Sequence, residues 1–145
     1  MPNSLKDCVY RGASQWTDCF ESKDPVGCAL CYEETASLVV EPFGTFRGRK
    51  AIEEFWDDLT GDGYYDLRFV QQRLTVVDAA EVHRQGIWTM SKAYGSLIDQ
   101  VWVVKGNGTA LMARDHFRFL GMITGGRQER SMIETILRNE HVSSC

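Results

Sequence analysis

Two acidic residues, far apart in a sequence of 145 residues, stand in apolar surroundings. Glu41 follows two valines and directly precedes Pro42, which holds the residue before it in an extended conformation and so fixes where its side chain points. Asp115 lies within ALMARDHFRFL, an alternating run that is typical of a strand. Two carboxyl groups in different environments can divide the roles of acid and base, so the pair predicts proton-transfer chemistry.

Alternation along the strand makes Asp115 the single charge on an apolar face. A buried carboxyl group must be paired, hydrogen-bonded or held protonated. A structural role remains open for each acid alone: an arginine-paired aspartate, or a solvated turn glutamate. The pattern places Leu111, Ala113, Asp115, Phe117 and Phe119 on one face and Met112, Arg114, His116 and Arg118 on the other.

Three helices are predicted in the first part of the chain, with an extended segment at Val39 and Val40 before the third. The first has an apolar stripe and ends near Ser22, and the second begins at the N-cap Asp24 with Pro25 and runs through about Glu34. The third follows Gly48 and ends at the GDG of residues 61–63. The stripes consist of Val9, Ala13, Trp16 and Phe20 in the first helix, and of Ala51, Ile52, Phe55, Trp56 and Leu59 in the third.

The rest of the sequence is typical of strands. LRFVQQRLTVV, EVHRQGIWTMS, LIDQVWVV and ALMARDHFRFL are rich in β-branched and aromatic residues, and KGNG predicts a hairpin between the last two. RQERSMIETIL fits a closing strand or a short helix, and both remain open. Helices followed by an antiparallel meander predict one α+β domain over residues 1–145, with a curved sheet wrapped over the helices.

Composition narrows the classes of function. The net charge of -4 provides no basic patch for nucleic acid. Neither a signal peptide nor an apolar run of about 20 residues is present, which predicts a cytoplasmic protein that does not enter membranes. Cys28 and Cys31 form a lone C-x-x-C that falls short of a zinc site, so we expect buried, inert thiols and no metal. The glycine-rich stretches lack the spacing and the lysine of a phosphate loop, and we expect no cofactor.

Two motifs together resemble a known family. VEPFG followed by G-R-x-x-I-x-x-F and an aromatic residue, together with D-x-x-R-F near the end, is similar to the ketosteroid isomerases and their wider nuclear-transport-factor-like, polyketide-cyclase-like superfamily. The resemblance covers most of the chain in the same order. It implies a cone-shaped α+β barrel in which N-terminal helices pack in the concave face of a mostly antiparallel sheet, and homodimers that pack sheet against sheet.

The resemblance also implies roles for residues. Glu41 occupies the place of the general base, and Asp115 that of a protonated aspartate that donates a hydrogen bond to the enolate oxygen. Trp16 and Trp56 stand where the family has tyrosines, and Tyr32 lies close to the place of a third. The implied activity is cofactor-free proton transfer, as in an isomerase, dehydratase or cyclase, on a small hydrophobic carbonyl compound. The expected pocket walls are Trp16, Tyr32, Phe55, Trp56, Trp88, Trp102 and Phe117.

Other functions fit the same fold. The chain could be a non-catalytic module that binds a hydrophobic ligand or forms a dimer. Epoxide hydrolysis would need an arginine in the pocket, for which Arg84 is the candidate, and dehydration would need a pocket histidine, which leaves His83. The polar strand face with Arg114, His116 and Arg118 fits either a subunit interface or a solvated surface.

Overall fold

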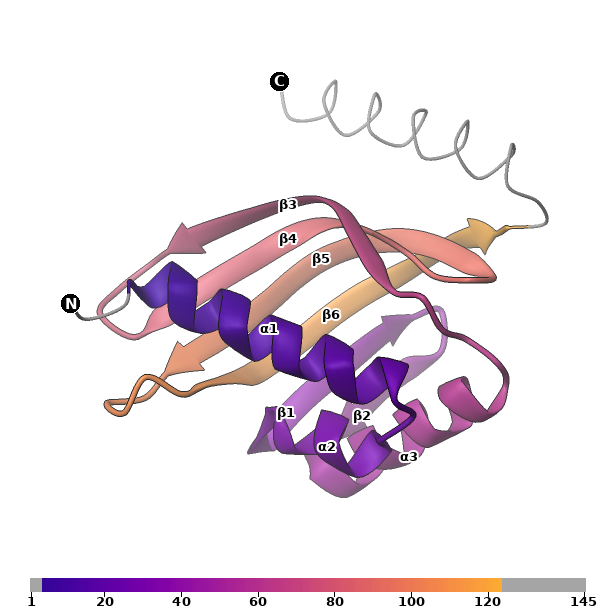
Figure 1. Cartoon of the computed structure of the whole chain (residues 1–145), viewed down its shortest axis with the longest axis horizontal. Coiled ribbons are helices and arrows are strands. Elements are labelled where there is room, and N and C mark those ends of the chain that lie inside the picture. Colours follow the sequence, from indigo (N-terminus) through magenta and orange to yellow (C-terminus); the bar gives the residue numbers. More distant parts are fainter. Residues whose placement is uncertain (1–3, 124–145) are drawn as a thin grey trace.

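A computed structural model of the chain describes residues 4–123 and shows three helices packed against a six-stranded sheet (Figure 1). The strand order in the sheet is β2-β1-β6-β5-β4-β3. The expected α+β class is therefore confirmed. The elements are α1 (Leu5–Glu21), α2 (Pro25–Leu30), β1 (Tyr32–Glu41), β2 (Gly44–Arg47), α3 (Gly48–Gly61), β3 (Arg68–Val76), β4 (Glu81–Thr89), β5 (Ala93–Val104) and β6 (Ala110–Met122).

α1 and α2 begin at side-chain N-caps, and the cap of α2 is the predicted Asp24. The Ser4 hydroxyl accepts a hydrogen bond from the Asp7 amide at the start of α1, and the Asp24 carboxylate accepts one from the Gly27 amide in α2. α2 ends at Leu30, which makes the prediction of a helix through Glu34 wrong. The chain turns at Cys31 and continues as β1, because its backbone there hydrogen-bonds to β6, a partner far along the sequence.

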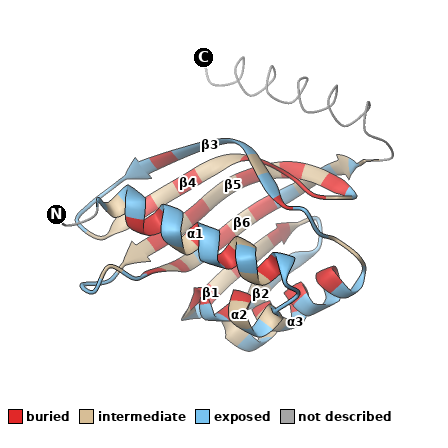
Figure 2. Cartoon of the chain, viewed as in Figure 1, coloured by how far each residue is buried: buried red, intermediate tan, exposed pale blue. Residues whose placement is uncertain are grey.

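All neighbouring strands are antiparallel except β1 and β6, which run parallel. α1 crosses one face of the sheet, and α2 and α3 lie together beside β1 and β2 (Figure 1). The buried positions, red in Figure 2, fall on the inner side of α1 and along the strands that it covers. The core thus lies between the helices and this inner face of the sheet.

A β-bulge in β6 corrects the predicted alternation. Val101 of β5 pairs with Arg114, but Trp102 pairs with Met112, so Ala113 is an extra residue in β6. The two sides of the bulge are out of phase, which buries Met112 on the inner face together with Asp115. The predicted faces therefore hold from Arg114 onward and are wrong before it. The KGNG hairpin is present, and RQERSMIETIL lies outside the described residues.

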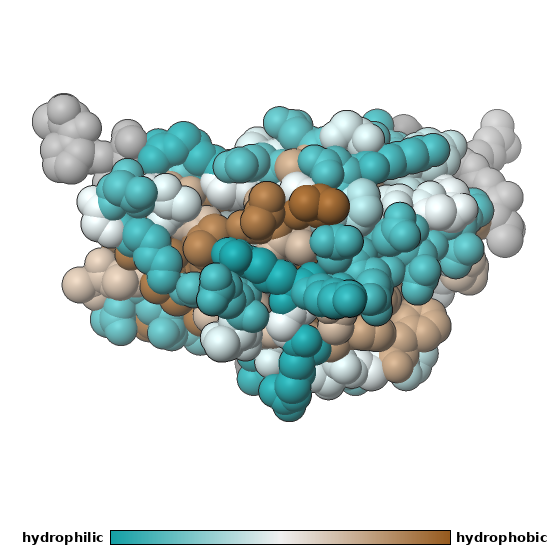
Figure 3. All heavy atoms as spheres, turned by 90° about the horizontal axis from the view of Figure 1, so that it is seen from below, coloured by the Kyte–Doolittle hydropathy of each residue, from teal (hydrophilic) through white to brown (hydrophobic). Residues whose placement is uncertain are grey.

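Seen from below, the molecule exposes an apolar patch within a hydrophilic surface (Figure 3). α2 lies on this side of the molecule, and its Val26 and Leu30 are more than half exposed. Cys28 and Cys31 of the same segment are buried, as expected. Within residues 4–123, no helix combines the length and apolar character that crossing a membrane requires.

Candidate functional site

A small cavity lies between α1, α3 and the inner face of the sheet. Its volume is about 30 Å³, which is room for one or two water molecules. Its wall is mostly aromatic and aliphatic, and three of the lining side chains contain a polar group: Trp16, Gln100 and Asp115. The lining residues are Trp16, Trp56, Leu67, Phe69, Trp88, Met90, Leu97, Gln100, Asp115 and Phe117.

Asp115 is only 3% exposed, and both of its carboxyl oxygens are hydrogen-bonded. The Tyr32 hydroxyl donates to Oδ2 at 2.6 Å, and the Gln100 side-chain amide donates to Oδ1 at 3.1 Å. Burial raises the pKa of Asp115, while these two bonds and the nearby charge of Arg84 act in the opposite direction. A carboxyl group with a raised pKa is better matched to proton transfer near neutral pH than an exposed one.

Tyr32 lies behind Asp115 and is fully buried. Its hydroxyl oxygen is 3.3 Å from Nε1 of Trp56, which donates to it. Burial, followed by the neighbouring Asp115, raises the pKa of Tyr32 well above the usual value for tyrosine. The phenol therefore stays protonated, and its hydrogen serves Asp115.

Gln100 connects Asp115 to a buried arginine. Its Oε1 accepts hydrogen bonds from Trp102 Nε1 at 2.7 Å and from Arg84 Nη1 at 3.1 Å. Arg84 is only 4% exposed, and burial lowers the pKa of its guanidinium to about 10. At neutral pH this group is still a cation, and its centre lies 3.9 Å from the centre of the Phe69 ring. Arg84 also donates through Nε to Oε1 of Gln72 at 2.9 Å.

Trp16 lines the cavity and carries an unused hydrogen-bond donor. Its side chain is 6% exposed, and within residues 4–123 its Nε1 is the single buried side-chain nitrogen or oxygen without a hydrogen-bond partner. The indole ring packs against Phe20 and Trp56, with ring centres 5.3 Å and 4.9 Å away. An unsatisfied buried N–H is costly, so this donor is available to a ligand that carries an acceptor.

The structure does not bring Glu41 to this cavity. In the parallel pairing, Leu38 lies beside Asp115 and Glu41 lies beside Arg118. Because side chains alternate along a strand, Glu41 points to the outer face of the sheet. There its carboxylate accepts hydrogen bonds from His116 Nε2 at 2.6 Å and from Arg118 Nη2 at 3.1 Å. The His116 bond is the largest cause that lowers the pKa of Glu41. The expectation that the two acids share one pocket is therefore corrected.

The predicted wall residues divide into two groups. Trp16, Trp56, Trp88 and Phe117 line the cavity, whereas Tyr32, Trp102 and Phe55 do not. Tyr32 instead donates a hydrogen bond to the lining residue Asp115, and Trp102 donates one to the lining residue Gln100. Phe55 packs against Phe46 and lines a separate surface groove instead.

Sequence reasoning missed Gln100. Its position two residues before Trp102, at an inward-facing place in β5, was the available signal. It also missed the aliphatic part of the wall, which carries no distinguishing pattern. The lining residues not predicted are Leu67, Phe69, Met90, Leu97 and Gln100.

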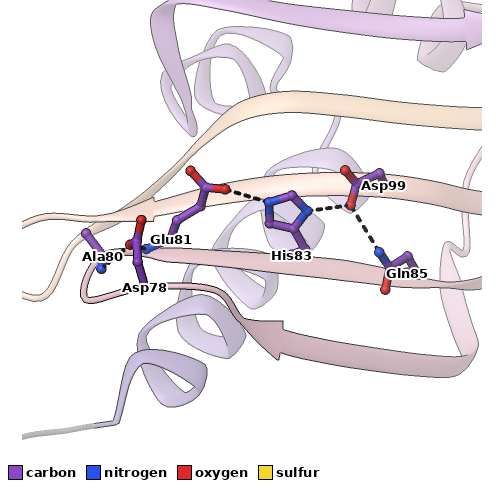
Figure 4. A network of polar contacts seen from close by, with 6 residues as sticks. All are labelled: Asp78, Ala80, Glu81, His83, Gln85 and Asp99. Carbon is purple, nitrogen blue, oxygen red and sulfur yellow. Dashed lines mark hydrogen bonds and ion pairs between the residues drawn. The ribbon is translucent and has the colours of Figure 1, made fainter.

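His83 lies on the outer face of the sheet, away from the cavity. Figure 4 shows its ring between two carboxylates, with Nε2 2.6 Å from Glu81 Oε2 and Nδ1 3.1 Å from Asp99 Oδ1. Asp99 also accepts a hydrogen bond from Gln85. The Glu81 bond is the largest cause that raises the pKa of His83. The route to dehydration through a pocket His83 therefore does not match this geometry. Within residues 4–123, no group of three His, Cys, Asp or Glu side chains could hold a metal ion.

No protein-family model matches the sequence, and no curated protein is significantly similar to it. Solved structures match the fold. A provisionally assigned scytalone dehydratase from Novosphingobium aromaticivorans superposes with a TM-score of 0.70 at 14% identity, covering 83% of this chain and 87% of that protein. An NTF2-like protein with a cystatin-like fold from the same species gives 0.65 at 14% identity, with coverages of 87% and 86%.

A ketosteroid isomerase-like protein from Erwinia carotovora atroseptica gives a TM-score of 0.65 at 11% identity, with 83% of this chain and 99% of that protein covered. Identities this low establish the fold alone. The chain has the nuclear-transport-factor-like fold, which ketosteroid isomerase-like proteins, a scytalone dehydratase-like protein and proteins of unknown function share. The expected fold is thereby confirmed.

Proposed function

We propose that this chain is a cofactor-free acid/base enzyme that transfers a proton within a small hydrophobic carbonyl compound. One observation carries the proposal: two side chains that line the same apolar cavity are Trp16, whose indole N–H has no partner among residues 4–123, and Asp115, whose carboxyl group is buried. In the proposed reaction Trp16 donates a hydrogen bond to the carbonyl oxygen, and Asp115 exchanges the proton beside it.

The chemistry of enolisation explains why both groups are needed. When a proton leaves the carbon next to a carbonyl, negative charge develops on the carbonyl oxygen. A fixed donor in a cavity without bulk water stabilises that charge, and loss of one such donor typically costs about 2.7–4 kcal/mol in the transition state. Trp16 Nε1 can supply the donor without breaking an existing hydrogen bond, because no group within residues 4–123 accepts from it.

The size and wall of the cavity restrict the substrate. A pocket for a drug-sized ligand measures about 300–1,000 Å³, whereas this cavity measures about 30 Å³. Lining side chains must therefore move when a substrate enters. Met90 and Leu97 line the cavity and can change rotamer more easily than the tryptophans. The aromatic remainder of the wall favours a flat, unsaturated molecule.

Glu41 is the competing base, because the resemblance assigns that role to it. Its carboxylate is engaged by His116 and Arg118 on the other face of the sheet, so our proposal gives it no part in the reaction. The two assignments make opposite predictions for the same pair of substitutions, Asp115→Asn and Glu41→Gln.

The test is hydrogen–deuterium exchange at the carbon next to the carbonyl, followed by NMR, with 2-tetralone and a β,γ-unsaturated steroid ketone as probes. We expect exchange with the wild type and with Glu41→Gln, and a loss of at least a hundredfold with Asp115→Asn. Thermal unfolding of each variant verifies the fold, because an asparagine amide facing the Gln100 amide would weaken the core. Loss in Glu41→Gln alone would overturn the assignment to Asp115.

A second candidate is a non-catalytic module of the same fold that binds a hydrophobic ligand or a second copy of itself; the small volume of the cavity favours the second copy, which needs no ligand inside. A homodimer would use the outer face of the sheet, where Arg114, His116 and Arg118 lie. Tryptophan quenching by 2-tetralone without any exchange would favour a ligand-binding module. A dimer in sedimentation velocity, with neither quenching nor exchange, would favour an assembly module.

A further inference from the structure

We propose that Asp115 acts as an ionised base and not as a neutral hydrogen-bond donor. Its two partners, Tyr32 and Gln100, both donate hydrogen bonds to it. Each partner is kept in that orientation by a neighbouring group that can only donate. In this arrangement Gln100 and Arg84 are positioning residues that act through their contacts. The inference rests on the proposed function and specifies the direction in which Asp115 moves the proton.

The first partner is Tyr32, whose hydroxyl can either donate or accept. An indole N–H can only donate, and Trp56 Nε1 donates to the Tyr32 oxygen at 3.3 Å. A phenol oxygen that accepts from Trp56 has its own hydrogen free for the 2.6 Å contact with Asp115 Oδ2. Trp56 therefore favours the arrangement in which Tyr32 donates to a carboxylate.

The second partner is Gln100, whose amide has one accepting and one donating end. Trp102 and Arg84 carry no acceptor, and both contact the same end of the Gln100 amide, at 2.7 Å and 3.1 Å. That end must be the oxygen. The amide N–H₂ is thereby turned toward Asp115 Oδ1 at 3.1 Å, and a rotated amide would face two donors.

Each oxygen of Asp115 thus accepts from a donor whose orientation is fixed by that donor's own neighbours. Hydrogen bonds to the charged form of a carboxyl group favour that form. Arg84 adds a buried positive charge two hydrogen bonds away, and a buried cation needs an anion nearby. Burial is the largest influence on the pKa of Asp115 and raises it, and four groups act against it: Tyr32 on β1, Gln100 on β5, Arg84 on β4 and His116 on the other face of β6.

An ionised Asp115 can complete the proposed reaction. Each carboxylate oxygen has two lone pairs and uses one for Tyr32 or Gln100, so lone pairs remain for the substrate. Asp115 takes the proton from the carbon beside the carbonyl, the C–H electron pair becomes a C=C bond, and the C=O π pair moves to the oxygen held by Trp16. Return of a proton from Asp115 to carbon restores the carboxylate, and exchange of that proton with solvent labels the substrate.

The deciding variant is Gln100→Glu, which has nearly the same shape and still accepts from Trp102 and Arg84. Its second oxygen faces Asp115 Oδ1, so the two carboxyl groups must share a proton. The matched control is Gln72→Glu, which places the same charge change on the exposed side of Arg84, where Gln72 accepts from Nε at 2.9 Å. Near-ultraviolet circular dichroism verifies that both variants retain the native fold.

The first readout is the ¹³C shift of the Asp115 carboxyl group in ligand-free protein, assigned by comparison with Asp115→Asn, between pH 4 and pH 9. We expect the ionised position at pH 7 in the wild type and in Gln72→Glu, and the protonated or shared position in Gln100→Glu. The second readout is 2-tetralone exchange. We expect it to fall at least tenfold in Gln100→Glu at pH 7 and to recover as the pH rises, which a purely structural defect would not do.

The outcomes separate the two proposals. A protonated Asp115 at pH 7 in the wild type overturns the inference, and continued exchange would then leave the proposed function standing with Asp115 as the acid. An ionised Asp115 without exchange in the wild type overturns the proposed function and with it the role as a base. Should Gln100→Glu fail to fold, the wild-type titration alone decides.

Discussion

The unpartnered Nε1 of Trp16 leads to an unusual expectation for stability. Trp16 and Trp56 are neighbouring buried indoles, 6% and 2% exposed, with ring centres 4.9 Å apart. They differ in that Trp56 Nε1 donates to Tyr32, while Trp16 Nε1 has no partner among residues 4–123. Replacing either with phenylalanine removes a similar volume, but Trp56→Phe removes a hydrogen-bonded N–H and Trp16→Phe removes an unpartnered one.

The magnitudes follow from these contacts. The smaller ring leaves a gap that lowers the free energy of unfolding by about 1 kcal/mol in either variant. Trp56→Phe also loses a hydrogen bond worth about 1 kcal/mol, for a total near 2 kcal/mol. Trp16→Phe instead removes a buried unsatisfied N–H, whose burial costs about 1–3 kcal/mol, so that variant should be as stable as the wild type or more stable.

Urea unfolding at pH 7, followed by far-ultraviolet circular dichroism, measures both free energies. The difference between the variants should be at least about 2 kcal/mol, and Trp16→Phe should still reduce 2-tetralone exchange a hundredfold or more. Equal destabilisation by the two substitutions would refute the reasoning, because it would mean that Trp16 Nε1 has a partner in the folded protein.

Further expectations concern other parts of the fold. Because the pKa of His83 is raised in the folded protein, its ion pairs contribute fully to stability at pH values below its unfolded pKa, about 6.5. This contribution is lost as the pH rises through the folded pKa. In His83→Gln, the free energy of unfolding measured with urea should therefore fall less over this pH range than in the wild type. Burial raises the pKa of Cys31 to about 11 and that of Cys28 further, so peptide mapping after iodoacetamide treatment at pH 8 should find both unmodified in native protein and modified in urea. A Cβ atom on Gly95 would lie 2.5 Å from the Trp88 ring and would also clash with the backbone of β6, so Gly95→Ala should lower the free energy of unfolding by about 3 kcal/mol. The control Gly106→Ala has open space around the added atom and should leave the stability unchanged. Thermal unfolding of both variants measures the difference.

Local patterns in the sequence sufficed to predict the helices, whose formation depends on residues that are close in the sequence. The apolar stripes with steps of three and four residues identified α1 and α3, and Asp24 with Pro25 placed the start of α2. α2 was predicted too long because the competing partner of residues 32–41 is β6. No pattern within the segment reveals a partner so distant in sequence.

The same limit explains the candidate site. Alternation placed Asp115 correctly on the apolar face, since the bulge at Ala113 lies on its N-terminal side. Pro42 restricts the backbone of Glu41, but the sheet register decides which face its side chain occupies. The orientation of the Gln100 amide depends on Trp102 and Arg84, which only the assembled sheet brings together.

The parallel pairing of β1 with β6 has a consequence for biosynthesis. Tyr32 and Asp115 are 83 residues apart, so their hydrogen bond cannot form until most of the chain has left the ribosome. Until β6 is synthesised, the apolar surface of β1 and of the helices packed against it stays exposed. Such exposure is typical of sheets built from non-local contacts. A ribosome that stalls before β6 is translated would leave a fragment in which neither the sheet nor the carboxylate site is completed. Such a fragment would be a ready substrate for chaperones and proteases.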